Sequence, residues 1–164
     1  MIRLLFLFTL LLAASAQAQV VANPNVGFAY TAPPGWSIRQ LPGISNPVAL
    51  GPVADKFSPN INVVDEAFAG SLEEYVAKNK QAFKQTFPDA SGWKESSFSN
   101  DSGLKGVKAA VRDTQENRKL RQIFYFFSGK QGRMIVVTCT ALVDDDASLA
   151  LFDKVLQTFQ VDRS

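Results

Sequence analysis

Apolar positions in the first third of the chain fall into short runs that proline and glycine separate. Between Phe28 and Gly51 the runs are interrupted at Pro33-Pro34-Gly35 and again at Pro42-Gly43. Each proline removes a backbone donor that a strand ladder needs, and each glycine permits a turn. The pattern predicts short strands over residues 28–51, followed by one further strand from Asn60 to Glu66.

The next segment has the three-and-four spacing of a helix with one apolar face, running from Ser71 to about Phe87. Ser71 with Glu74 three residues later matches a capping box at its start, and Pro88 follows its end. The predicted apolar stripe consists of Leu72, Tyr75, Val76, Asn79, Phe83 and Phe87. Asn79 is the only polar residue among them.

From Trp93 onward the period changes to two, and turn signals divide the sequence into four consecutive runs. The turn signals lie at residues 100–103, 113–117 and 129–132. Residues 104–113 alternate between apolar and charged side chains, as in a strand with one solvated face. Residues 123–127 and 134–137 are apolar on both faces, which predicts central strands covered on two sides.

The last element is predicted as a helix from about Asp145 to Phe159, with apolar residues along one stripe. The run Asp144-Asp145-Asp146 lies at its start, where carboxylates cap free N–H groups, and it lacks the spacing of a calcium loop. This helix can cover one face of the sheet, and the helix that begins at Ser71 can cover the other face or the rim. We therefore predict an α+β domain, in which an antiparallel β-sheet of about six or more strands ends in a meander and is flanked by two main helices.

The N-terminus has the pattern of a cleaved signal peptide over residues 1–18. Arg3 supplies the positive charge, Leu4 to Ala14 form an apolar run, and Ala16-Gln17-Ala18 provides small residues for cleavage. A helix over that run spans roughly 16 Å, which is short of the ~30 Å hydrocarbon core of a bilayer. We expect export to the periplasm or the medium, with the protein not integral to the membrane.

The net charge and the cysteine content limit the kinds of partner and cross-link that the protein can have. The 17 basic and 15 acidic residues give a net charge of +2, and loss of Arg3 with the signal peptide lowers this to about +1, too little for nucleic acid as the partner. Cys139 is the only cysteine, so no intrachain disulfide can form, and its alternating neighbours predict a buried, unreactive thiol. After the signal peptide we expect a flexible leader over residues 19–27 and a single domain over residues 28–164.

The order of these features resembles the PsbP-like superfamily, and within it the exported DcrB-like bacterial proteins. The matching segments are Phe28-Ala29-Tyr30 before Pro34-Gly35-Trp36, the helix start at residues 71–75, the stretch from Gln122 to Ala141, and Phe152 to Phe159. The resemblance implies an antiparallel sheet layered between helices, an α-β-α sandwich, and a role in binding rather than catalysis. No motif here matches a photosystem metal or docking residue.

The chain contains no histidine, which removes the commonest general base and the commonest transition-metal ligand. No nucleophile elbow, phosphate-binding loop or dinucleotide fingerprint is present. We therefore predict no catalytic residues, no cofactor and no metal. The alternative is a hydrolase-type enzyme that uses paired carboxylates or Ser-Lys chemistry, although no spacing singles out such a pair.

The aromatic side chains are the remaining candidates for a binding site. Most of the 13 phenylalanines must belong to the core. Trp36 after a turn and Trp93 at a strand start either pack under loops or, with Tyr30, line an apolar groove. We predict an exported non-enzymatic domain that binds an envelope protein or an apolar small ligand, or that stabilises an envelope assembly as an accessory protein.

Overall fold

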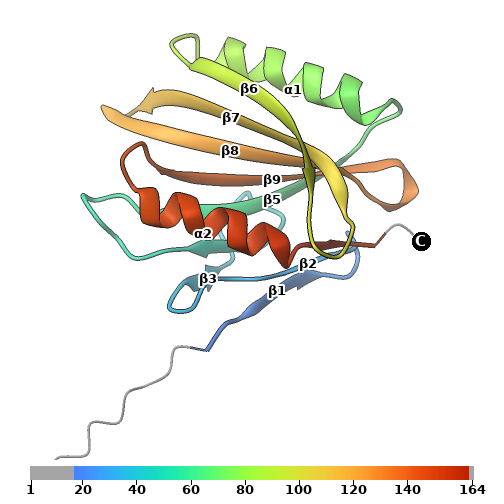
Figure 1. Ribbon diagram of the computed structural model, residues 1–164, viewed down its shortest axis with the longest axis horizontal. Helices are drawn as coiled ribbons and strands as arrows, with labels where there is room; N and C mark the ends of the chain where they lie inside the picture. The colour runs from blue at the N-terminus through green and yellow to red at the C-terminus, as the bar shows by residue number, and fades with distance from the viewer. Residues whose placement is uncertain (1–16, 163–164) are drawn as a thin grey trace, which may run out of the picture.

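The computed structural model describes residues 17–162, so the predicted signal peptide lies outside the described residues up to residue 16. The described chain forms ten strands, two α-helices and one short 3-10 helix (Figure 1). In chain order they are β1 (Val20–Asn23), β2 (Phe28–Thr31), β3 (Ser37–Arg39), β4 (Val48–Leu50), β5 (Asn60–Ala67), α1 (Leu72–Thr86), β6 (Ser91–Ser99), β7 (Lys105–Gln115), β8 (Arg118–Ser128), η1 (Lys130–Gly132), β9 (Arg133–Leu142), α2 (Asp146–Gln157) and β10 (Gln160–Val161).

Seven strands form one antiparallel sheet in the order β3-β4-β5-β9-β8-β7-β6. The predicted meander is formed by the four strands before α2, in which β6 pairs with β7, β7 with β8, and β8 with β9. The other side of β9 pairs with β5. The two runs predicted to be central are β8 and β9, which have strands on both sides and are buried through most of their length. Both predictions are confirmed.

Each face of this sheet is covered by one helix. On one face Tyr75 and Val76 of α1 pack against strands β7, β8 and β9. On the other face Phe152 and Leu156 of α2 pack into a larger cluster that includes Tyr125. The predicted layering of helix, sheet and helix is confirmed, and the alternating side chains of β7 and β8 explain it because neighbours along a strand point to opposite faces.

Both helix starts follow the predicted capping chemistry. The Ser71 side chain accepts the Glu74 N–H at 3.1 Å, and the Glu74 carboxylate accepts the Ser71 N–H at 2.7 Å, which completes the capping box. At the start of α2 the Asp145 carboxylate accepts the Ser148 N–H at 3.0 Å. Local hydrogen bonds therefore begin each helix where the sequence indicates.

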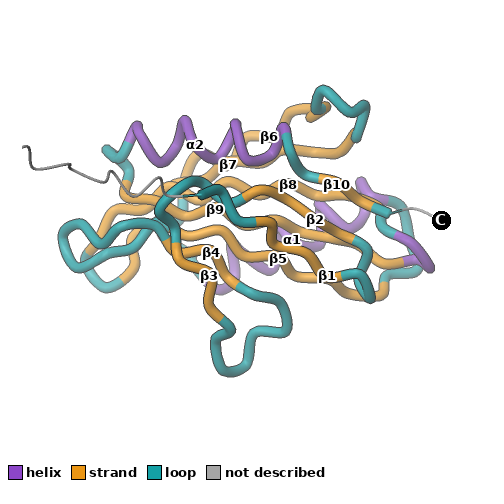
Figure 2. The backbone as a smooth tube through the Cα atoms, turned by 90° about the horizontal axis from the view of Figure 1, so that it is seen from below, coloured by secondary structure: helices purple, strands orange, loops and turns teal. Residues whose placement is uncertain are grey.

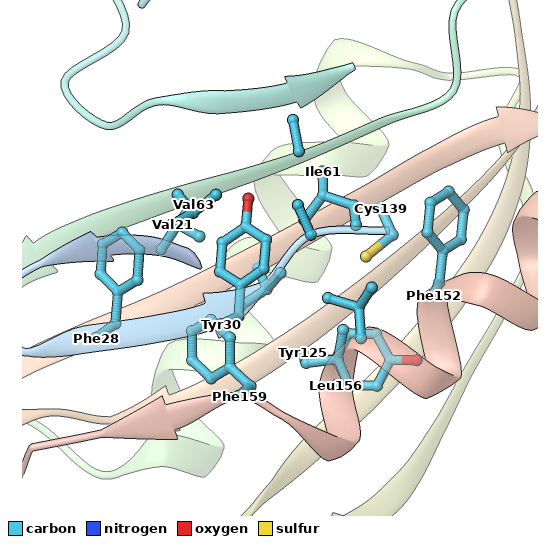
Figure 3. Packing of buried hydrophobic residues seen from close by; sticks show 14 of the residues in the cluster. Val21, Phe28, Tyr30, Ile61, Val63, Tyr125, Cys139, Phe152, Leu156 and Phe159 are labelled. Atoms are coloured by element: carbon cyan, nitrogen blue, oxygen red, sulfur yellow. The ribbon is translucent and has the colours of Figure 1, made fainter. Parts of the chain in front are cut away.

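A second, smaller sheet in the order β1-β2-β10 lies on the α2 side, and the flexible leader predicted over residues 19–27 is wrong (Figure 2). Residues 20–23 pair with β2 as β1, and the Val21 side chain is buried. The chain end returns as β10 along the other side of β2. Figure 3 shows Phe28 and Tyr30 of β2 beside Phe159, with the rings stacked at centroid distances of 5.9–6.5 Å.

Candidate functional site

The large sheet ends in a long strand, β6, that pairs with no strand on its outer side within residues 17–162. Four strands lie at sheet edges in the described chain: β3 has three residues, β10 two, β1 four and β6 nine. Figure 1 shows β6 as the outermost strand on its side of the large sheet. An uncovered edge of this length presents a row of backbone groups that can pair with another chain.

The two halves of β6 differ in how far they are protected from such pairing. Near its start the register with β7 shifts between Ser91 and Lys94, where Gly92 has a φ of +72°, and a bulge of this kind interrupts an edge. Lys94 and Glu95 add exposed charge. The remaining segment, Ser96 to Ser99, has no charge, proline or bulge, and only Phe98 is turned into the core. The second half of β6 is therefore the accessible half.

A hydrogen bond at the turn between β6 and β7 shows which backbone groups of β6 face outward. The Asn100 N–H donates to the Leu104 carbonyl at 3.1 Å, so residue 100 faces β7. Backbone direction alternates along an antiparallel strand, so residues 98 and 96 also face β7, whereas Ser99, Ser97 and Glu95 direct their N–H and C=O groups away from the sheet.

A hollow lies beside this segment on the α1 side of the sheet. It measures about 500 Å³ and lies between the start of α1 and the β6–β7 pair. Leu72 and Val107 give it apolar surface, and its charged lining consists of Glu73, Glu95 and Lys105. Glu95 accepts the Trp93 indole N–H at 2.6 Å and lies 3.4 Å from the Lys80 ammonium, whereas Glu73 forms no ion pair with another described residue.

The three aromatic residues predicted to line a groove are divided by the sheet. Tyr30 and Trp36 belong to the cluster on the α2 side, where they are 1% and 5% exposed and Trp36 packs edge-on against Phe152. Trp93 lies on the α1 side against Phe83 and Phe124. The structure does not bring these side chains into one groove, and all three pack as part of a core.

One cluster of ionisable groups lies at the contact of α2 with the sheet. The Asp153 carboxylate accepts from Lys108 at 2.6 Å and from the buried Tyr125 hydroxyl at 2.7 Å. Burial raises the pKa of Asp153, but the hydrogen bonds from Lys108 and Tyr125 outweigh it, and the net pKa lies below the ordinary value. Burial, with Cys139 and Asp153 nearby, raises the pKa of Tyr125. Both shifts lead away from neutral pH, so the cluster joins helix to sheet and holds neither group ready for proton transfer.

Cys139 is fully buried in β9, as predicted, and Figure 3 places it among Ile61 and Phe152. Burial raises the pKa of its thiol, which lowers the fraction of reactive thiolate. Within residues 17–162 no group of three or more Cys, Asp or Glu side chains is arranged to hold a metal ion. No helix in that range has the length and apolarity needed to span a membrane.

The β6 edge and its hollow were not predicted from the sequence. The signal that could have indicated them is the serine-rich run from residue 96 to residue 99, which lacks both a continuous apolar face and a helical period. Such a run is typical of a strand with two solvated faces. Its position at the sheet edge depends on the order of all seven strands, which the sequence pattern does not determine.

No protein-family profile and no curated protein sequence matches the chain. Solved structures do match. The cyanobacterial PsbP protein CyanoP from Synechocystis superposes with a TM-score of 0.61 at 17% identity, over 94% of this chain and 98% of that one. LpqN, described as involved in cell envelope biogenesis of Mycobacterium tuberculosis, has a TM-score of 0.58 at 14% identity, over 89% and 91% of the two chains.

The Ran-binding protein Mog1p of Saccharomyces cerevisiae also superposes, with a TM-score of 0.57 at 12% identity over 91% of this chain and 97% of that one. Each of these structures covers nearly the whole described chain, although the identities are low. The narrower resemblance to the DcrB-like branch stays a prediction. This chain therefore has the PsbP-like α+β fold, which confirms the fold that the sequence resemblance implies.

Proposed function

We propose that this chain is a non-enzymatic binding domain for a protein partner, and that the partner adds an extended segment to the outer side of β6. The observation that carries the proposal is the accessible half of β6, where Ser97 and Ser99 direct their backbone groups outward. A strand added there gains main-chain hydrogen bonds without any rearrangement of the sheet.

The hollow next to β6 supports a preference in side chains. Alternate residues of an added strand point to the α1 side of the sheet, where the hollow lies. Leu72 and Val107 favour an apolar side chain there. Glu95 is already paired with Lys80, and Lys105 lies on the β7 side of the hollow, so it is Glu73, beside α1, that favours a neighbouring lysine or arginine. The partner segment that fits this surface is an extended peptide with apolar and basic residues on one face.

Two further observations support a binding role over catalysis. The ionisable groups with shifted pKa values, Tyr30, Tyr75, Tyr125, Cys139 and Asp153, all move away from the neutral range. Among the proteins with this fold, Mog1p is described as Ran-binding, which is binding of a protein. We further propose that the protein acts after export, in the cell envelope or outside it, on the basis of the N-terminal pattern around Arg3 and Ala18.

The test compares two substitutions at one residue. Ser97→Pro removes the outward N–H and leaves the pairing of β6 with β7 in place, because an edge strand tolerates proline where its N–H faces solvent. Ser97→Thr keeps the N–H and the strand propensity, and is the matched control. Peptides selected from a displayed random library on the wild-type domain serve as the probe.

We expect the selected peptides to bind wild type and Ser97→Thr with similar affinity and to bind Ser97→Pro at least about tenfold more weakly, which corresponds to ~1.4 kcal/mol. The urea midpoints of both variants report that the fold is intact. Equal binding by all three proteins would contradict strand addition at β6. Selected peptides without an apolar and basic pattern would contradict the assigned role of the hollow.

A further inference from the structure

A second hollow lies at the other end of β6, on the face of the sheet opposite α1. It measures about 120 Å³. Three basic side chains line it: Lys94 of β6, Arg112 of β7 and Arg121 of β8. Arg112 lies directly opposite Arg121 in the register of β7 with β8, and opposite Ser91 in the register of β7 with β6. Residues that pair across antiparallel strands share a face, so the two guanidinium groups extend from the same face of the sheet.

These three cations form no ion pair with a carboxylate within residues 17–162. The ion pairs of the described chain use other cations: Lys78, Lys80, Lys108, Arg118, Lys130 and Arg133. Like charges placed directly opposite each other across a strand pair are unfavourable. Arg121 is in addition only partly exposed, which limits the water that can screen its charge. The register therefore places two like charges on neighbouring strands, and an anion bound to both would reduce their repulsion.

The backbone at this end of β6 leaves space for such an anion. The bulge places Gly92 and Trp93 opposite Val111 alone, so one residue of β6 is displaced from the ladder. A Cβ atom built on Gly92 would meet nothing within 4 Å, so the hollow is open above the glycine.

The dimensions limit the ligand. A volume of about 120 Å³ exceeds the ~10–15 Å³ that one water needs and falls well below the ~300 Å³ of a pocket that encloses a whole small molecule. Guanidinium groups match the paired oxygens of phosphate and carboxylate, and Lys94 adds a third positive charge. Two arginines and one lysine suit an oxyanion with more than one negative charge, and hence a phosphoryl group over a single carboxylate.

We infer that the hollow between Lys94, Arg112 and Arg121 is a binding site for a phosphoryl oxyanion. This site is separate from the proposed partner surface, which uses the outward backbone of residues 95–99 and the α1 face. The phosphate-binding experiment can therefore fail while strand addition at β6 is confirmed, and the reverse. The phosphoryl group can belong to a small soluble phosphate or to the headgroup of an anionic phospholipid, because both offer the same oxygens to the arginines.

The experiment uses the domain of residues 17–162 as wild type, Arg112→Gln and Arg121→Gln. Each protein is titrated with inorganic phosphate by calorimetry at a fixed 150 mM chloride. Arg39→Gln is the matched control, since Arg39 is exposed on β3 at the opposite edge of the sheet and lies in no described ion pair. We expect one phosphate per chain for wild type and Arg39→Gln, and affinity at least about tenfold lower in both pocket variants, as expected for loss of a charge-assisted hydrogen bond.

A second arm measures sedimentation with phosphatidylcholine vesicles that contain phosphatidic acid, with and without competing phosphate. Vesicle binding that phosphate displaces and that Arg121→Gln abolishes identifies the lipid headgroup as the source. Phosphate binding without vesicle binding identifies a soluble phosphate. The inference is wrong if wild type binds neither probe saturably, or if the pocket variants bind as wild type does. Circular dichroism of each variant shows that lost binding is not lost folding.

Discussion

Two buried tyrosines in the same cluster are expected to respond in opposite directions when each loses its hydroxyl group. Tyr30 and Tyr125 are 1% and 0% exposed, and both pack in the cluster on the α2 side of the sheet (Figure 3). The Tyr125 hydroxyl donates to the Asp153 carboxylate at 2.7 Å. The Tyr30 hydroxyl has no hydrogen-bond partner among the described residues. Substitution by phenylalanine removes one oxygen in each case and keeps the ring.

The expected magnitudes follow from this difference. A hydrogen bond to a charged acceptor contributes about 1.5–3 kcal/mol. The Asp153 side chain is 58% exposed and keeps Lys108 as a partner at 2.6 Å, so we place the loss for Tyr125→Phe at the lower end, about 1–2 kcal/mol. A buried hydroxyl without a partner costs about 1–3 kcal/mol, so Tyr30→Phe should raise the free energy of unfolding by about 1 kcal/mol.

Urea denaturation with fitted slopes measures both effects. Equal slopes for the three proteins show that the midpoint shifts report stability alone. In thermal scans, 1 kcal/mol corresponds to a change of roughly 2–4 °C in Tm for a domain of this size. A Tyr30→Phe variant that is less stable than wild type by about 1 kcal/mol or more would show that the Tyr30 hydroxyl has a partner. A Tyr125→Phe variant as stable as wild type would show that the hydrogen bond to Asp153 contributes nothing. Either result would contradict the expected difference between the two tyrosines.

Three further predictions concern charge and burial. The folded pKa of Asp153 lies below its unfolded value of 3.8, so the stability that its carboxylate contributes is fully present above that value and is lost as pH falls through the folded pKa. The difference in stability between wild type and Asp153→Asn should therefore be constant from pH 6 to 8 and shrink below about pH 4. Acid titrations of both proteins measure this difference. Arg112→Gln should stabilise the domain by about 0.2–1 kcal/mol in dilute, phosphate-free buffer and by less in high salt, since it removes a like-charge pair with Arg121; a loss of stability in denaturant titrations would mean that the two charges do not repel. Cys139 should react with a thiol reagent in the folded protein far more slowly than in denaturant, and equal rates would place the thiol at the surface.

The parts of the fold that the sequence predicts well depend on nearby residues. The capping box of Ser71 and Glu74 needs only four consecutive residues, and it begins α1 where expected. The apolar runs of β8 and β9 identify central strands because both faces of each run must be covered. Local chemistry and hydrophobic period are enough for these elements.

The small sheet depends on contacts between distant parts of the chain. β1 is four residues long, and β10, which pairs beside it on β2, lies more than 120 residues later. Short segments of this kind have too few positions to show a period, which is why residues 19–27 read as a leader. Burial of Val21 against the α2 side orders them in the folded protein.

The candidate sites escape prediction for a related reason. Arg112 and Arg121 are nine positions apart in sequence, and only the register of β7 with β8 places them opposite each other. The edge position of β6 follows from the insertion of β9 between β5 and β8, a long-range pairing. In contrast, Trp36 and Trp93 were predicted to line a groove on the basis of residue type alone, and they lie on opposite faces of the sheet. Both proposed surfaces depend on the order and register of the strands, which the pattern of a single sequence does not determine.

Backbone amide exchange at β6 tests the proposed binding mode most directly. Exchange of the Ser97 and Ser99 N–H groups is followed by NMR in the wild-type domain, alone and saturated with a library-selected peptide. Both groups face away from β7, so they should exchange quickly in the free protein and be strongly protected in the complex, while the inward amides of residues 96 and 98 are protected in both states. Unchanged exchange at Ser97 and Ser99 in a saturated complex would contradict strand addition at this edge.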